Sequence, residues 1–296
     1  MRVSRLSLVL ALGTAIVAIS FAAIFIRLAQ AEGVPALSIA AWRLTFASLL
    51  MLPYALATRR DEIRSLYRRE LALVAASGVF LGLHFATWVS SLDYTSVASS
   101  VVLVTTGPIF VGLGSWLLLG ERPNSKLAVG IVIAATGSII VSWSDLIQSQ
   151  SHLLGDLLAL SGAIMIAGYF MIGRKLRARH SLVTYTALVY TAAALALLAF
   201  ALIGRQSLLG LSLPAYGWML LMALVPQLIG HSALNWALRH LSATYVAIVT
   251  LAEPIGSSIL AYVILREATS LSTALGGAVI LTGIYIASRA ELARKP

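Results

Sequence analysis

The chain has 296 residues, of which 59% are hydrophobic and only 11% are charged, with no cysteine and a formal net charge of +10. A soluble domain carries about 25% charged residues, so this composition excludes a water-soluble protein and predicts a polytopic membrane protein. The absence of cysteine excludes a disulfide framework and a thiolate metal site. The basic residues form short clusters between apolar runs, as in loops that face anionic lipid headgroups, which argues against a nucleic-acid partner.

Ten apolar runs are long enough to cross about 30 Å of hydrocarbon as helices. In chain order the predicted spans are 7–28, 37–58, 70–90, 97–119, 127–147, 153–173, 182–203, 215–238, 244–265 and 271–288. The expected fold class is therefore an all-α integral membrane protein. Several connections are only a few residues long, so we expect consecutive helices to be antiparallel neighbours.

The first apolar run resembles a signal peptide, because it follows Arg2 and Arg5 and ends in Ala-Gln-Ala at residues 29–31. It is longer than the hydrophobic region of such a peptide, and it also matches the sixth predicted helix. We therefore expect the run to be retained as a membrane helix.

The lysine and arginine residues are distributed unevenly between the two sides of the predicted membrane. With the N-terminus inside, most of the 21 fall in cytoplasmic segments, whereas Arg27, Arg205 and Arg266 lie outside and Arg43 lies within the second helix. The positive-inside rule then predicts a multi-pass protein of the cell inner membrane with both termini in the cytoplasm.

The chain also contains one unit twice. One shift along the sequence places Pro108 on Pro254, Glu121 on Glu267 and Gly137 on Gly283. Upstream the match continues at a shift that is two residues longer, which places Trp88 on Trp236. We expect two repeats, residues 1–148 and 149–296. Since each repeat holds five helices, the second must enter the membrane inverted, which is the usual basis of alternating access around a central cavity in secondary transporters.

Motifs in both halves carry a family resemblance. The first half holds Trp42-Arg43, the segment 88–98, Pro108 and Gly120-Glu121-Arg122, the second half holds Glu253-Pro254 and Arg266-Glu267, and the proline-to-glutamate spacing is equal in each half. Over nearly the whole chain these motifs resemble the EamA-type ten-helix exporters of the drug/metabolite transporter superfamily, and the chain is similar to its aromatic amino-acid exporters. The resemblance implies a gradient-driven or facilitative transporter without a cofactor, whose cavity is lined mainly by the first four helices of each repeat.

Glu253 lies near the middle of the ninth predicted helix, where an ionised carboxylate is costly unless it is paired, hydrated or protonated. Pro254 frees a backbone carbonyl and permits a kink, and Pro108 occupies the matching place in the first half. We expect these three residues to act in coupling or gating. Two roles stay open for Glu253: it exchanges protons or binds a substrate amine, or it caps the broken backbone or pairs with Arg43.

Arg43 and two pairs of residues are candidates for the wall of the cavity. Arg43 could receive a substrate carboxylate, form a structural ion pair, or extend toward the interface. His84 and Trp88 lie one helical turn apart, as do His231 and Asn235, so each pair shares a helix face. Because the repeats are inverted, we expect the first pair in the outer half of the membrane and the second in the inner half.

The remaining candidates carry hydroxyl groups or aromatic rings: Ser20, Tyr94, Thr106, Tyr169 and Trp236. Serine and threonine in membrane helices commonly bond their own backbone, and tryptophans also form interface belts, so packing is the alternative for these residues. Glu121 and Glu267 lie at helix-end elbows, where we expect capping or gating ion pairs.

Absences in the sequence narrow the predicted function. A single mid-helix cation cannot clamp a phosphate-bearing substrate, and the first helix lacks the carboxylate of the small four-helix multidrug exporters. No H-E-x-x-H, G-x-S-x-G or paired-aspartate motif is present, so we do not expect an enzyme. The prediction is a monomeric exporter of small metabolites, foremost amino acids including aromatic ones, with protons as a candidate coupling partner and lipid as its surroundings. The alternative is an exporter of drugs or other amphiphilic metabolites.

Overall fold

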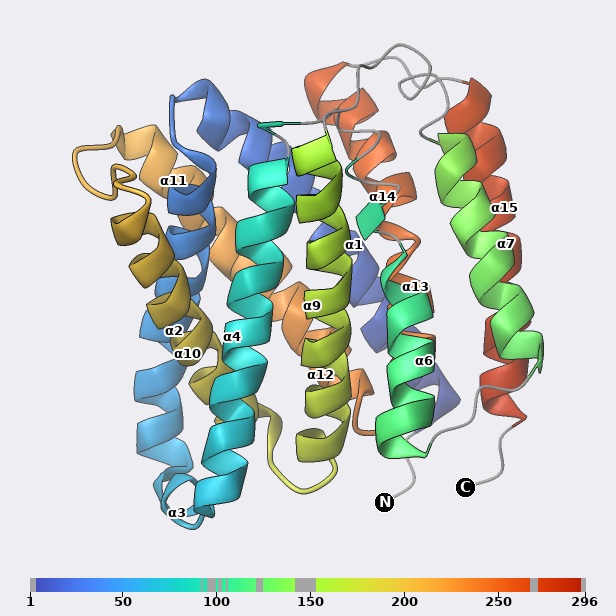
Figure 1. Cartoon of the computed structure of the whole chain (residues 1–296), viewed down its shortest axis with the longest axis horizontal. Helices are drawn as coiled ribbons and strands as arrows, with labels where there is room; N and C mark the ends of the chain where they lie inside the picture. The colour runs from blue at the N-terminus through green and yellow to red at the C-terminus, as the bar shows by residue number, and fades with distance from the viewer. Residues whose placement is uncertain are drawn as a thin grey trace.

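The structure, a computed structural model, describes residues 4–91, 93–94, 100, 103–104, 106–120, 125–141, 153–266 and 271–293. These residues form helices and turns. The helices stand side by side in an elongated bundle (Figure 1). Glu121 and Glu267, with the ion pairs expected there, lie outside the described residues.

The elements of the first half are α1 (Arg5–Ala31), α2 (Ala36–Thr58), α3 (Arg60–Arg64), α4 (Arg68–Ser91), α6 (Gly107–Leu119) and α7 (Ser125–Val141). Those of the second half are α9 (Leu153–Arg177), α10 (Leu182–Ile203), α11 (Leu213–Met222), η1 (Ala223–His231), α12 (Ser232–Ala237), α13 (Ala243–Thr250), α14 (Glu253–Leu260), η2 (Ala261–Leu265) and α15 (Leu271–Leu292). The segments η1 and η2 are π-helical.

The predicted fold class is confirmed: the chain is an all-α membrane protein, consistent with ten helices in two repeats. The eighth predicted helix is built from α11, η1 and α12, and the ninth from α13, α14 and η2. Within the described residues, seven helical stretches are long and apolar enough to cross a membrane. The predicted fourth and fifth helices extend on one side beyond the described parts, α6 and α7.

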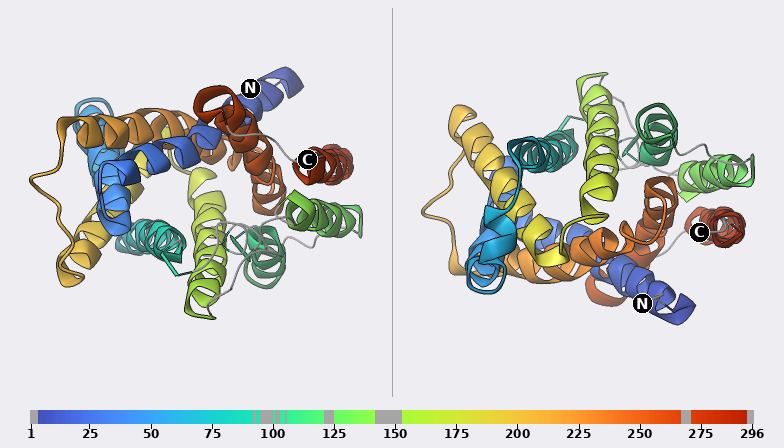
Figure 2. Two further views of the ribbon diagram at one scale, coloured as in Figure 1. Left: turned by 90° about the horizontal axis from the view of Figure 1, so that it is seen from above. Right: turned by 90° about the horizontal axis from the view of Figure 1, so that it is seen from below.

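The packing of the helices repeats between the two halves. Helix α1 contacts η1 and α14, and helix α9, the first of the second half, makes the matching contacts with α4 and α6. The second helices, α2 and α10, pack together, and so do α7 and α15, which stand apart at one end of the bundle (Figure 2). The two halves are therefore interleaved, and the middle of the protein is built from both.

Polar contacts join the halves at both ends of α2. At one end the Trp42 Nε1 donates to the Leu208 carbonyl at 2.8 Å. At the other end a Glu62 oxygen accepts from the Ser181 N–H at 2.6 Å. Burial raises the pKa of Glu62, but the hydrogen bonds from Ser181 and its neighbours outweigh this effect and leave the pKa below its usual value. The charged form is thereby favoured in the folded protein.

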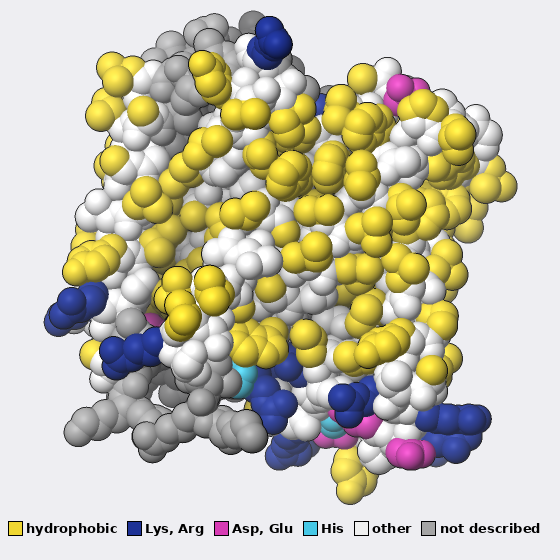
Figure 3. Space-filling view, turned by 180° about the vertical axis from the view of Figure 1, so that it is seen from behind, with side chains coloured by type: hydrophobic (Ala, Val, Ile, Leu, Met, Phe, Trp, Pro, Cys, Tyr) yellow, Lys and Arg dark blue, Asp and Glu magenta, His cyan; other side chains and the backbone are white. Residues whose placement is uncertain are grey.

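Charged and apolar side chains separate on the surface as the sequence predicts. Most visible lysine and arginine side chains gather at the end of the bundle that carries α3, and apolar side chains cover the surface above it (Figure 3). Both ends of the chain lie at that same end (Figure 1). This agrees with the expected orientation, although the sidedness of the membrane stays a prediction.

The closest helix contact, between α7 and α15, depends on glycine. A Cβ atom added at Gly283 would lie 2.6 Å from the Ala134 nitrogen and 2.7 Å from the Gly130 oxygen. A Cβ atom at Gly137 would lie 2.7 Å from the Ile280 nitrogen. Two backbones can approach so closely only where side chains are missing, so the glycines seven residues apart mark the contact that joins the fifth helices of the repeats.

The substitution Gly283→Ala should lower the free energy of unfolding by roughly 1–3 kcal/mol, because its methyl group would overlap the backbone of α7. Thermal unfolding of the purified protein in detergent measures this effect. Gly217→Ala is the matched control, since nothing lies within 4 Å of a Cβ atom at that position. Equal stability of the two variants would contradict this account of the contact.

Candidate functional site

The ninth predicted helix is broken in the middle. Helix α13 ends at Thr250, residues 251–252 form a turn, and α14 begins at Glu253 with Pro254 in its first turn. Pro108 occupies the first turn of α6 in the same way. Proline fits this position because the N–H that it lacks has no partner within the helix. Each half of the protein thus starts a new helix at the matched proline.

The Glu253 side chain is half-buried at this break. The residue at the N-cap is Ala252, and no side chain caps this helix end. Glu253 interacts electrostatically with Arg43, but no ion pair within 4.0 Å joins the two among the described residues. Neither of the structural roles considered for Glu253 therefore has support in the described contacts.

Arg43 lies in α2 with only 3% of its surface exposed, which rules out an extension to the interface. Its Nε donates to Gln227 Oε1 at 2.9 Å, and its guanidinium lies 4.2 Å from the centre of the Phe85 ring. Within the described part of the chain, Gln227 is the one hydrogen-bond partner of this side chain. The group is thus held at one nitrogen, and its two terminal nitrogens remain available.

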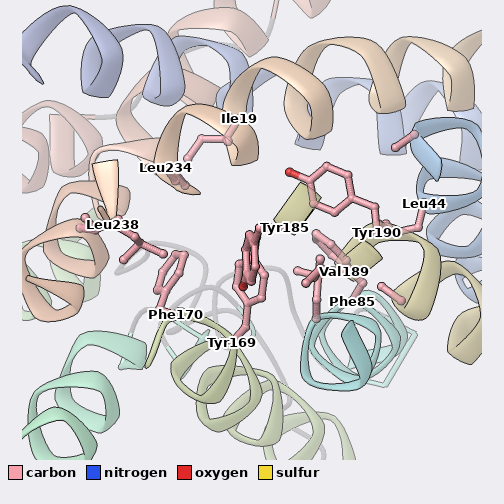
Figure 4. Packing of buried hydrophobic residues seen from close by; sticks show 14 of the residues in the cluster. Ile19, Leu44, Phe85, Tyr169, Phe170, Tyr185, Val189, Tyr190, Leu234 and Leu238 are labelled. Carbon is pink, nitrogen blue, oxygen red and sulfur yellow. The ribbon is translucent and has the colours of Figure 1, made fainter. Parts of the chain in front are cut away.

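Tyrosine hydroxyls and an amide continue the polar contacts away from Gln227. Tyr190 donates to the Gln227 carbonyl at 3.3 Å, and Asn235 Nδ2 donates to the hydroxyls of Tyr169 at 2.6 Å and of Tyr190 at 3.4 Å. Side chains of Phe85, Tyr169 and Tyr190 extend from α4, α9 and α10 into one central region (Figure 4). Both halves of the protein contribute to this region.

The two histidines meet at Phe85. The ring centres of His84 and His231 lie 5.0 Å and 5.6 Å from that of Phe85. The sequence placed them in opposite halves of the membrane, whereas the crossing of the interleaved halves brings them to one ring. We call the following residues the central polar cluster: Arg43, His84, Phe85, Tyr169, Tyr190, Gln227, His231 and Asn235.

Some buried polar atoms in this region have no hydrogen-bond partner among the described residues. They are Trp88 Nε1, Gln227 Nε2, His231 Nδ1 and Asn235 Oδ1. Buried polar atoms in proteins are nearly always bonded, and leaving one without a partner costs about 1–3 kcal/mol. Atoms of this kind call for a bound molecule, such as a water, an ion or a substrate, as the missing partner.

The structure places the other sequence candidates at varied distances from the cluster. The Trp88 ring stacks on the His84 ring, with 5.9 Å between the ring centres, whereas the Trp236 ring packs on His240. Ser20 is buried between α1 and α14, where it donates to the Glu253 carbonyl at 3.3 Å.

Two further candidates have no described contact with the cluster. Thr106 donates to the carbonyl of Leu103, three residues earlier. Tyr94 lies in the turn after α4 and is 48% exposed.

Sequence reasoning missed Phe85, Tyr190 and Gln227. One signal for Gln227 was available, because it precedes His231 by the same four residues that separate His231 from Asn235. No comparable pattern marks Phe85 or Tyr190, since aromatic residues are common throughout apolar helices.

One family model matches the chain twice, once in each half. The model of the EamA-like transporter family matches residues 6–143 and again residues 153–289. The chain belongs to the EamA-like transporter family. It is therefore a membrane transporter of the drug/metabolite superfamily, which agrees with the expectation that it is not an enzyme.

Relatives of this EamA-like transporter include proteins of known and unknown substrate. An uncharacterized transporter of Archaeoglobus fulgidus is 26% identical over 96% of this chain and 97% of its own length. The pseudopaline exporter CntI of Pseudomonas aeruginosa is 25% identical over 87% of each chain. A solved crystal structure, 21% identical, matches 99% of this chain and 100% of the other with a TM-score of 0.77, which shows the same fold.

The substitution Tyr169→Phe should destabilise this EamA-like transporter by about 1–3 kcal/mol, because the buried Asn235 amide would lose its shortest hydrogen bond. Thermal unfolding in detergent is the measurement, with Tyr262→Phe as the control, since that side chain is 59% exposed. An unchanged unfolding temperature for Tyr169→Phe would show that this hydrogen bond contributes nothing to the fold.

Proposed function

We propose that this protein is a secondary transporter that exports small zwitterionic metabolites, foremost amino acids including aromatic ones, by alternating access of its two repeats. The observation that carries the proposal is the buried Arg43 guanidinium, which is held by Gln227 at Nε, has no described partner at its terminal nitrogens, and has Glu253 within electrostatic range. A fixed cation and a fixed anion that do not pair with each other match the two charges of an amino acid.

The binding of the carboxylate follows from the chemistry of Arg43. A planar guanidinium donates two parallel hydrogen bonds to a carboxylate, and such charge-assisted pairs are about twice as strong as neutral hydrogen bonds. A cation inside the membrane is costly without a counter-charge. A substrate carboxylate at Arg43 would supply that counter-charge, so the protein gains stability from the interaction that binds its substrate.

The amine and the side chain of the substrate have partners nearby. Glu253 lies at the start of α14, half-buried and without a described side-chain hydrogen bond, which suits either an ammonium group or an exchangeable proton. The Phe85 ring lies against Arg43, His84 packs on Phe85, and Trp88 stacks on His84. Aromatic faces stack well on one another, and this favours aromatic amino acids among the substrates.

The proposal includes the orientation and the oligomeric state. Both termini face the cytoplasm of the inner membrane, and one chain suffices because its two halves complete the cluster between them. The second candidate is export of other amphiphilic metabolites. It is supported by the pseudopaline exporter of Pseudomonas aeruginosa, and by a riboflavin transporter of Rhizobium johnstonii that is 32% identical over 38% of this chain.

Counterflow in proteoliposomes tests the proposed function. Vesicles preloaded with unlabelled amino acids, without an ion gradient, should accumulate labelled tryptophan transiently, because a carrier exchanges internal for external substrate. Empty vesicles and vesicles loaded with a sugar are the controls. Correctly folded protein that gives no counterflow with any amino acid would overturn the amino-acid proposal and favour the second candidate.

The substitution Glu253→Gln should reduce tryptophan counterflow about tenfold or more, because losing one charge interaction of about 1.4 kcal/mol changes affinity by that factor. If Glu253 carries the exchanged proton, the rate of counterflow in the variant should also depend less on pH. Asp61→Asn in α3, outside the cluster, is the matched control. Wild-type rates and an unchanged pH profile in Glu253→Gln would exclude both functional roles for this carboxylate.

A further inference from the structure

We propose that Gln227 is a substrate-binding residue that selects for a carboxylate, and that the π-helical segment η1 places its amide beside Arg43. The inference rests on the proposed function and deepens it, since it names the chemical group that the site selects. It begins from two independent observations, the orphaned amide nitrogen of a fully buried side chain and the unusual backbone that carries it.

The Gln227 side chain is 0% exposed, and its two polar atoms have different surroundings. Its oxygen accepts from Arg43 Nε at 2.9 Å, whereas its nitrogen has no hydrogen-bond partner among the described residues. A buried amide with two unused N–H groups is unfavourable unless something binds there. The orphaned N–H groups belong to a side chain that already touches Arg43, so they lie next to the available nitrogens of the guanidinium.

A glutamine at this position keeps Arg43 available as a cation. A glutamate would hold the guanidinium more strongly, but it would also neutralise the charge and present no donor. The glutamine oxygen fixes Arg43 without a counter-charge, and the glutamine nitrogen adds donors of its own. Donors from two side chains around a positive charge that forms no direct ion pair among the described residues make a surface that fits a carboxylate.

The backbone at Gln227 has a π-helical arrangement that few helices adopt. Segment η1 is π-helical over Ala223–His231 and contains Pro226, and the Ser232 N–H donates to the Gln227 carbonyl, five residues earlier. Long π-helical runs are rare and occur frequently at functional sites. Two hydroxyls, of Tyr190 at 3.3 Å and of Ser232 at 3.5 Å, also donate to the Gln227 carbonyl.

Packing against α1 fixes the position of η1 in the bundle. A Cβ atom at Gly230 would lie 2.6 Å from a methyl carbon of Ile19 and 3.2 Å from its backbone nitrogen. The missing side chain at Gly230 therefore lets η1 pack closely on α1, while Gln227, three residues earlier, bonds Arg43 of α2. Placement by packing favours a specific contact, since a loosely placed donor discriminates poorly between ligands.

The test compares acids with the amines that lack only the carboxylate: tryptophan with tryptamine, and phenylalanine with phenethylamine. Counterflow gives the KM of each compound for the wild type, Gln227→Met and Gln227→Glu. We expect both substitutions to raise the KM of the acids about ten- to hundredfold, the range of one charge-assisted hydrogen bond, while the KM of the amines changes less than about twofold. Gln206→Met, in the loop after α10, is the control.

A purely structural role predicts a different result. If Gln227 serves only the packing of the core, Gln227→Met would lower the unfolding temperature and would change the KM of acids and amines by the same factor. A Gln227→Glu variant with wild-type unfolding temperature and an unchanged ratio of acid to amine KM would overturn the inference.

A second readout separates this inference from the proposed function. The shift in unfolding temperature of the purified protein with each acid and amine reports binding without transport. A shift with acids but no counterflow would refute transport of amino acids. A shift of the same size in the Gln227 variants as in the wild type would overturn the inference. If no acid gives either a shift or counterflow with the wild type, both the proposed function and this inference are overturned.

Discussion

A buried positive charge sets the requirements that the centre of this transporter has to meet. Arg43 is almost entirely removed from the surface, and a cation inside the membrane must have partners that offset the loss of water. Among the described residues Arg43 Nε donates one hydrogen bond to Gln227, the guanidinium lies on the face of the Phe85 ring, and Glu253 is within electrostatic range. Under the proposed function, a substrate carboxylate completes this solvation.

This arrangement requires helices from both halves of the chain, and the interleaving of the repeats brings them together. Helix α1 packs on the third and fourth helices of the second half, and α9 does the same with the first half. Each half therefore lacks a complete site, and a movement of one half against the other must change the surroundings of Arg43. Alternating access needs this kind of coupling between the site and the arrangement of the repeats.

Irregular backbone is concentrated near the same region. Membrane helices tolerate breaks only where protein or a water-lined cavity satisfies the freed polar groups. Near Pro254 the Ser20 hydroxyl, which bonds the Ile16 carbonyl at 2.7 Å, also reaches the Glu253 carbonyl at 3.3 Å, and in η1 two hydroxyls donate to the Gln227 carbonyl. The interruptions are thus bonded by neighbouring helices, and they place polar side chains that regular helices would orient differently.

The sequence by itself predicted the all-α membrane fold, the similarity of the two halves and the break at Pro254, because hydrophobic length, internal similarity and proline chemistry are local properties of the chain. It also singled out Arg43, His231 and Glu253 as polar groups that a membrane span does not readily accommodate. Only the tertiary structure decided that Arg43 bonds Gln227 and that both histidines meet at Phe85. Those contacts join residues far apart in the chain, and they depend on how two interleaved, inverted halves cross, which no local pattern encodes.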